Sequence, residues 1–166
     1  MKRSSWLKNW WESARVSSRR RHHAAHQAEV LEHRQLLSAS GLFIPATGEL
    51  NLQLGSQDNV RISSQAGRVL VELSTGAGAY SPVTSLGTIA SASVQALVIV
   101  GGDDTNTIDL NGVTATEFTG LTSILVDAGN GHDTIIGSPD FADDITAGHG
   151  DDTISGQGGA DTIRGG

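Results

Sequence analysis

Several residue types that usually shape a globular protein are scarce or missing in this chain of 166 residues. There is no cysteine, which excludes a disulfide framework, a thiolate metal site and a thiol nucleophile. Aromatic residues make up only 4% of the chain, so a core anchored by large rings is not expected. Glycine, by contrast, is abundant. The composition therefore favours a thin aliphatic core and an architecture rich in turns.

Long apolar runs are also missing. No stretch of 18 or more apolar residues occurs, so no transmembrane helix is expected. No apolar segment of about 7 to 15 residues follows the basic positions near the N-terminus, so a standard cleavable secretory signal is not expected either.

Charge of the two signs is separated along the chain. Residues 1–40 hold eight basic and three acidic side chains, whereas residues 41–166 hold three basic and fifteen acidic ones. A folded nucleic-acid-binding region would carry a basic surface, so nucleic acid is excluded as an expected partner. An acidic excess concentrated in turns is suited to binding a cation.

Residues 1–40 form a basic N-terminal tail that differs from the rest of the chain. It holds the run Arg19–Arg21 and three nearby histidines, and the spacing of its apolar residues places them on one side of a helix: Trp6, Leu7, Trp10, Trp11 and Ala14. One interpretation is an amphipathic segment that lies on a membrane surface. We favour a mostly disordered or partly helical tail, because so short an apolar stripe stabilises a helix poorly.

The segment from Leu31 to Ala39 reads L-E-H-R-Q-L-L-S-A. It resembles the LEPR-XLL segment near the N-termini of many bacterial surface and extracellular proteins, with His33 in place of the usual proline. The resemblance implies an address or processing signal for export, and hence a secreted bacterial protein at the cell surface or outside the cell. Alternatively, the leucines simply close a helix.

Residues 41–127 are predicted to be a β-strand region with degenerate repeats. Apolar and polar residues alternate over 50–54 and 69–73, which indicates two antiparallel or coiled strands with one buried face. Residues 55–58 and 65–67 have the composition of turns, and residues 74–93 that of a long loop. A buried strand follows at 94–100.

Internal similarity is the most informative feature of the sequence. Residues 97–108 match residues 124–135, apolar on apolar and turn on turn, at an offset of 27, which is three times nine. Three clear nine-residue units follow at 128–136, 147–155 and 156–164, and a degenerate unit of ten residues lies at 137–146. A nine-residue frame therefore begins before the clear repeats.

These units resemble the hemolysin-type, or RTX, nonapeptide repeat G-G-x-G-x-D-x-U-x, in which U is a large aliphatic residue. The resemblance covers residues 128–166 and implies a parallel β-roll or β-solenoid that binds Ca²⁺. The residues that it assigns to the metal sites are Asp133, Asp143, Asp152, Asp161, Gly129, Gly131, Gly148, Gly150 and Gly158. Alanine replaces the first glycine at Ala128 and Ala147.

The chemistry of these residues suits that assignment. Glycine allows the positive φ angles of tight turns, and it lets main-chain carbonyls converge without interference from a Cβ atom. Calcium takes six to eight oxygen ligands, which carboxylates and loop carbonyls can supply, whereas Mg²⁺ demands a stricter octahedron. The unit at 101–109 has Asn106 at the carboxylate position, so we expect it to be a structural unit without calcium.

If two units form one coil, as in the RTX family, units two apart stack. Asp133 then lies next to Asp152, and Asp143 next to Asp161. Carboxylates at strand spacing repel one another, so folding of this region is expected to require the ion. The alternative is that the aspartates only cap turns in an ion-free solenoid.

No catalytic constellation is expected. No serine lies in a nucleophile elbow, and His132 and His149 lie at different positions of their repeats. The sequence predicts a calcium-binding structural or adhesion-type protein, with a partner at the cell surface or in a matrix that the sequence does not identify. The alternatives are a truncated fragment of a larger secreted RTX protein, whose activity lies elsewhere, and an ion-independent β-solenoid spacer.

Overall fold

The computed structural model describes residues 39–166, all of which lie in one compact unit. The expectations for a basic tail and for the LEPR-XLL-like segment fall almost entirely on residues 1–38, outside the described residues. Over residues 39–166 the chain is β-structured, with one short 3-10 helix at Ser91–Ser93 and no α-helix. The predicted all-β class is confirmed for this part of the chain.

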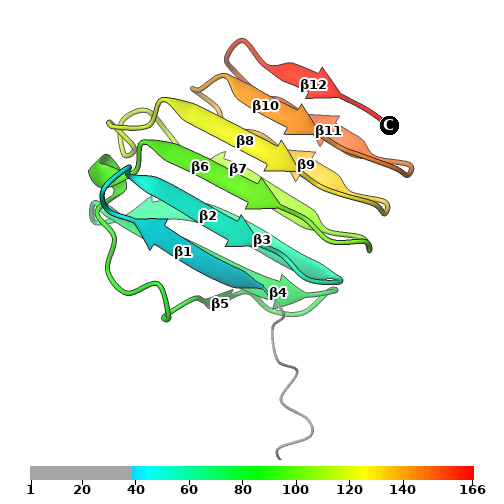
Figure 1. Cartoon of the computed structure of the whole chain (residues 1–166), viewed down its shortest axis with the longest axis horizontal. Helices are drawn as coiled ribbons and strands as arrows, with labels where there is room; N and C mark the ends of the chain where they lie inside the picture. The colour runs from blue at the N-terminus through cyan, green and yellow to red at the C-terminus, as the bar shows by residue number, and fades with distance from the viewer. Residues whose placement is uncertain (1–38) are drawn as a thin grey trace, which may run out of the picture. The chain divides into compact units, whose positions relative to one another are not determined.

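The strands form two six-stranded mixed sheets (Figure 1). In order across the first, called sheet A, are β1 (Ser40–Ile44), β2 (Glu49–Gln53), β6 (Ala96–Val100), β8 (Ser123–Asp127), β10 (Asp143–Thr146) and β12 (Thr162–Arg164). In order across the second, called sheet B, are β11 (Thr153–Ser155), β9 (Thr134–Ile136), β7 (Thr107–Gly112), β3 (Asp58–Gln65), β4 (Arg68–Thr75) and β5 (Ser81–Pro82).

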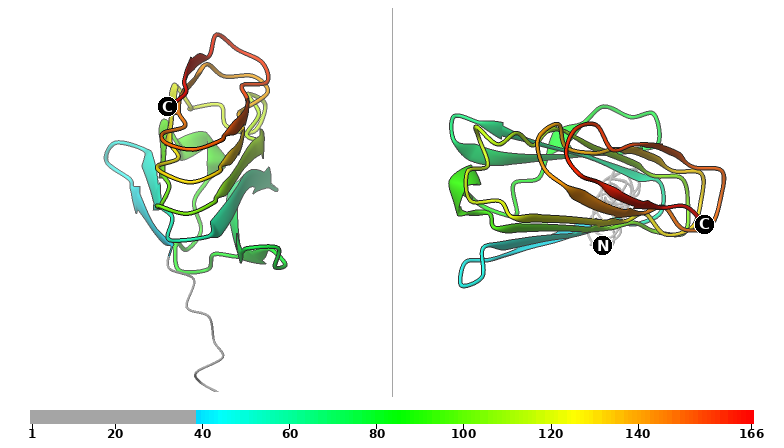
Figure 2. Two further views of the ribbon diagram at one scale, coloured as in Figure 1. Left: turned by 90° about the vertical axis from the view of Figure 1, so that its right-hand side faces the viewer. Right: turned by 90° about the horizontal axis from the view of Figure 1, so that it is seen from above.

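Strand direction divides the described residues into two parts. The pairs β1–β2, β3–β4 and β4–β5 are antiparallel, and every other pair is parallel. From β6 to β12 the chain alternates between the sheets, so that each strand from β8 onward lies beside the strand two before it (Figure 2). One strand of each sheet with its connecting loops is called a coil below.

An aliphatic core fills the space between the sheets. Inward side chains stack in rows across the parallel strands, and one such row on sheet A is Leu52, Ile99, Val126 and Ile145. On sheet B, Val60, Ile108 and Ile135 form the matching row. Among the buried hydrophobic residues of the described part, Phe118 is the only aromatic one. The core is therefore aliphatic, as the composition predicts.

The offset of 27 residues between the two matching segments is confirmed by strand register. Leu97 lies opposite Ile124 in sheet A, and Thr107 lies opposite Thr134 in sheet B. The repeats found in the sequence thus occupy equivalent positions in successive coils.

Two expectations for the N-terminal strands need correction. Of the two alternatives for residues 50–54 and 69–73, antiparallel or coiled strands, the antiparallel one was wrong, because these residues fall on β2 and β4 of different sheets. The partner of β4 is β3, a strand that was not predicted, joined to it by a tight turn with positive φ at Ala66 and Gly67. Residues 74–93 are mainly a loop, as expected, with the short strand β5 within them.

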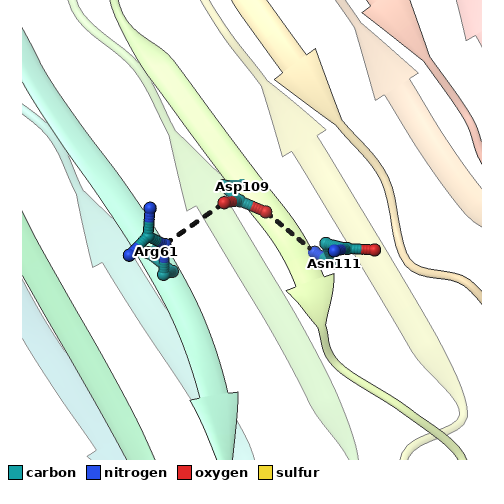
Figure 3. A network of polar contacts seen from close by, with 3 residues as sticks. All are labelled: Arg61, Asp109 and Asn111. Carbon is teal, nitrogen blue, oxygen red and sulfur yellow. Dashed lines mark hydrogen bonds and ion pairs between the residues drawn. The ribbon is translucent and has the colours of Figure 1, made fainter.

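The outer face of sheet B carries a polar network that joins β3 to β7 (Figure 3). Arg61 Nε lies 3.2 Å from Asp109 Oδ2, and the N–H of Asn111 donates to Asp109 Oδ1. The Arg61 guanidinium also lies 4.4 Å from the centre of the Tyr80 ring. These contacts tie the antiparallel strands to the parallel coils.

No helix in the described range is long and apolar enough to cross a membrane.

Candidate metal centre

A column of polar side chains runs between the sheets just before the strands of sheet B. The strand register places four residues at equivalent positions, one before β7, β9 and β11 and the first residue of β3: Asp58, Asn106, Asp133 and Asp152. The first three side chains are buried, and Asp152, in the last coil, is half-buried. This set is called the polar column below.

Hydrogen bonds connect Asp133 and Asp152 each to the coil before it. The backbone N–H of Asn106 donates to Asp133 Oδ1 at 2.8 Å, and the backbone N–H of Asp133 donates to Asp152 Oδ1 at 2.9 Å. Each carboxylate therefore reaches back across one strand spacing. Asp133 and Asp152 lie beside one another, in the pairing that stacking of units two apart predicts.

Asp133 is a buried carboxylate of the column that is only partly satisfied. Its side chain is 1% exposed, and its Oδ2 atom makes no hydrogen bond within residues 39–166. Burial raises the pKa of the Asp133 carboxyl above its ordinary value, the N–H of Asn106 opposes this rise, and the nearby Asp152 charge adds to it. A buried carboxylate oxygen without a partner is costly, so a proton or a nearby cation would stabilise this position.

A second acidic pair lies on the opposite edge of the coils, at the start of β10 and just before β12. The backbone N–H of Asp143 donates to Asp161 Oδ1 at 3.0 Å. Asp143 is 2% exposed and also accepts from the backbone N–H of Ser138 at 2.7 Å and lies 3.0 Å from its hydroxyl. Burial raises the pKa of Asp143, and the two bonds from Ser138 partly offset that effect.

The glycines assigned by the repeat line loops that stack directly on one another. Gly129, Gly131, Gly148 and Gly150 all have φ between 90° and 143°. A Cβ atom at Gly148 would lie 1.7 Å from the carbonyl oxygen of Gly129, and one at Gly150 would lie 1.4 Å from that of Gly131. Only glycine fits where carbonyl oxygens approach so closely.

Gly158 has a different setting. Gly158 does not have a positive φ angle, but its neighbours Gln157 and Gly159 do. A Cβ atom at Gly158 would lie 2.3 Å from the carbonyl oxygen of Pro139 in the loop below. Close stacking of loops thus also occurs on the edge that carries Asp143 and Asp161.

The residues present fit a hard cation bound largely by oxygen atoms of the main chain. Within residues 39–166 no three Asp, Glu or His side chains gather at one point, so side chains alone form no complete shell. The stacked loops bring main-chain carbonyls close to the aspartates, and Asp133 Oδ2 is a buried acceptor that no donor occupies. Carboxylates with carbonyls suit Ca²⁺ better than a metal that prefers nitrogen or sulfur.

Sequence reasoning missed two residues of this arrangement. Asp58, expected only in a turn, heads the polar column and is fully buried, and Ser138 binds Asp143 from within the degenerate unit. Asp58 lies 48 residues before Asn106, which is not a multiple of nine, so the repeat frame does not reveal it. No regular spacing signals Ser138 either.

Comparison of the chain with protein-family models, with curated proteins and with solved structures finds no match.

Proposed function

We propose that residues 128–166 bind Ca²⁺ in a parallel β-roll, through Asp133, Asp143, Asp152 and Asp161 with the carbonyls of the adjoining glycine loops. The observation that carries the proposal is the buried Asp133 Oδ2, which has no hydrogen-bond partner among the described residues and lies beside a second carboxylate. A divalent cation between the stacked carboxylates would replace repulsion by attraction. The polar column is then stable at neutral pH.

In sheet A, β10 pairs in parallel with β8 and with β12, and in sheet B, β9 pairs in parallel with β7 and with β11, which supports the β-roll. So do the loop glycines, which leave space for carbonyls at the level of each aspartate. When bound, the ion supplies positive charge between coils. The chain's part is to hold the carboxylates and carbonyls in register, and the buried Ile135 and Ile145, two residues after Asp133 and Asp143, anchor that register in the core.

The last coil has few contacts of its own to stabilise it. Ile163 of β12 is 48% exposed and Ile154 of β11 is half-buried, so these strands bury less apolar surface than those of the inner coils. Ion binding to the folded state alone would add stability by mass action. We therefore propose that Ca²⁺ is required to order residues 147–166.

We further propose that the protein is a structural or adhesion-type protein that bacteria export, as the LEPR-XLL-like segment implies. The carboxylates are then ligands and no enzymatic role is assigned to them. An ion-independent spacer is the second candidate. It is favoured by the coils up to β8, where aliphatic rows pack without a pair of stacked aspartates such as Asp133 and Asp152.

Calcium titration of the full chain separates the two candidates. We expect the β signal in circular dichroism to rise and saturate as Ca²⁺ is added and to fall again with EDTA, and isothermal titration calorimetry to report uptake of Ca²⁺. Asp152→Ala should weaken binding about tenfold or more, because it removes a charged ligand.

Asp127→Ala is the matched control, because Asp127 is an exposed aspartate on β8 outside the polar column. It should leave the affinity unchanged. A spectrum and a heat signal that do not respond to millimolar Ca²⁺ would reject the calcium proposal in favour of the spacer.

A further inference from the structure

Asn106 occupies the aspartate position of the polar column but has the opposite hydrogen-bonding role. Its Nδ2 donates to the carbonyl oxygen of Asp58 at 2.8 Å and to that of Gly55 at 3.3 Å. Asp133 and Asp152, at equivalent positions, accept from the preceding coil at their carboxylates. Asparagine therefore brings donors to main-chain oxygens where aspartate brings only acceptors.

The Asn106 side chain is also fully satisfied. Its Oδ1 accepts from the backbone N–H of Gly102 at 3.0 Å, and the side chain is completely buried. One coil further, by contrast, Asp133 Oδ2 has no hydrogen-bond partner among residues 39–166. The contact between Asp58 and Asn106 thus needs no ion, whereas the contact between Asp133 and Asp152 brings two carboxylates together.

We infer that Asn106 fixes the N-terminal limit of the cation column, because its amide makes the contacts to the Gly55 and Asp58 carbonyls that a cation would otherwise make. This inference rests on the proposed function. It divides the described residues into coils that hold together without ions, up to β7, and coils beyond Asn106 that need them. The backbone N–H of Asn106 donates to Asp133 Oδ1, so the ion-independent coils support the first of the coils that need ions.

The substitution Asn106→Asp tests this inference. It replaces two donors by an acceptor that faces two carbonyl oxygens inside the core, so the site then needs a cation or a proton. Asn111→Asp makes the same chemical change at an exposed residue of β7 and is the matched control. Asn106→Ala removes the donors without adding charge.

The measurements are hydrogen exchange over β2, β3, β6 and β7 in EDTA, and equilibrium dialysis with Ca²⁺ alone, on the full chain. The wild type and Asn111→Asp should keep these strands protected in EDTA. Asn106→Asp should lose about tenfold or more of the protection in β3 and β7, regain it with Ca²⁺, and bind one ion more than the wild type. Asn106→Ala should lose protection that Ca²⁺ does not restore.

Two results would overturn the inference: full protection of Asn106→Asp in EDTA, or an ion count in Asn106→Asp no higher than in the wild type. The wild-type ion count judges the proposed function separately, since a wild type that takes up no Ca²⁺ refutes calcium binding by residues 128–166. The difference between the two chains judges Asn106.

Discussion

At the scale of single residues, the two buried aspartates differ in how their charge is compensated. Asp143 accepts two hydrogen bonds from Ser138 and keeps both oxygens engaged. Asp133 accepts one, from Asn106, and its second oxygen has no donor in the described part of the chain. Because a buried charge without partners is strongly unfavourable, Asp133 should depend more than Asp143 on a cation bound at the proposed site.

This difference predicts an unusual response to acid. The folded-state pKa of Asp133 and of Asp143 is raised above the ordinary value of 3.8, so the ion-free fold favours the protonated groups. Their contribution to stability is fully present below pH 3.8 and is lost as the pH rises through the raised values. In EDTA, the melting temperature should therefore increase as the pH falls from 7 toward about 4.

With saturating Ca²⁺ the trend should reverse, because protons and the cation compete for the same carboxylates. Thermal melts across this pH range, with and without Ca²⁺, measure both trends. Asp133→Asn should weaken both trends, since it removes one of the two titrating groups. A melting temperature in EDTA that falls steadily with acid would contradict the role given to these two carboxylates.

At the scale of loops and strands, glycine serves two purposes that one pair of variants separates. Gly148 has φ +90° and no space for a Cβ atom, whereas Gly67 has φ +73° in the β3–β4 turn and nothing within 4 Å of its added Cβ. Alanine at Gly67 should cost about 1–2 kcal/mol for backbone strain alone. Alanine at Gly148 should cost about 2–4 kcal/mol, because the Gly129 carbonyl must also move.

Urea denaturation with Ca²⁺ present measures these free energies of unfolding. The Gly148→Ala variant should also bind Ca²⁺ more weakly, whereas Gly67→Ala should bind it as the wild type does. Equal losses of stability in the two variants would show that the stacked carbonyls are not held tightly against the Gly148 position.

The nine-residue period and the spacing of the repeats predict the parallel coils well, because the loops take up the irregularity of the repeat. The degenerate unit at 137–146 has one extra residue, yet β10 keeps its register with β8, because the extra residue is taken up before Asp143 in the loop between β9 and β10. Ile145 therefore stays on the inward face beside Val126. An insertion inside a strand would have moved the isoleucine to the outer face.

The antiparallel strands could not be predicted in the same way. The strand β3 contains Val60 and Ile62 among polar residues, too few to stand out from a turn. It nevertheless includes the buried Asp58, whose main-chain carbonyl accepts a hydrogen bond from Asn106 in the next coil. Such a contact between segments 48 residues apart has no local signal.

At the scale of the whole described region, the two ends of the stack differ. One end carries the antiparallel strands β1, β4 and β5, and the other ends in the parallel strands β11 and β12, beyond which sheet A and sheet B have no further strand in residues 39–166. Core burial follows the same direction: Ile145 is completely buried, and its stacked neighbour Ile163 is 48% exposed.

Truncation of these two isoleucines should therefore have unequal effects. Ile145→Ala should lower the free energy of unfolding by about 2–5 kcal/mol, because it leaves a cavity between the sheets. Ile163→Ala should lower it by less than about 1 kcal/mol, since its side chain keeps half of its contact with water. Denaturant melts at saturating Ca²⁺ compare the two, and similar losses would mean that the last coil is packed as tightly as the inner one.

The one-sided stack also has a mechanical consequence. A pulling force applied at Gly166 acts first on β12, which only β10 holds in its sheet, and detaches it before any inner strand bears tension. With a repeat of 18 residues between Asp143 and Asp161, the detached outermost coil releases about 60 Å of extended chain. The repeat is 19 residues between Asp133 and Asp152 and 27 between Asn106 and Asp133, so the steps should lengthen toward the inner coils, and ions at the proposed calcium sites would resist the outer ones.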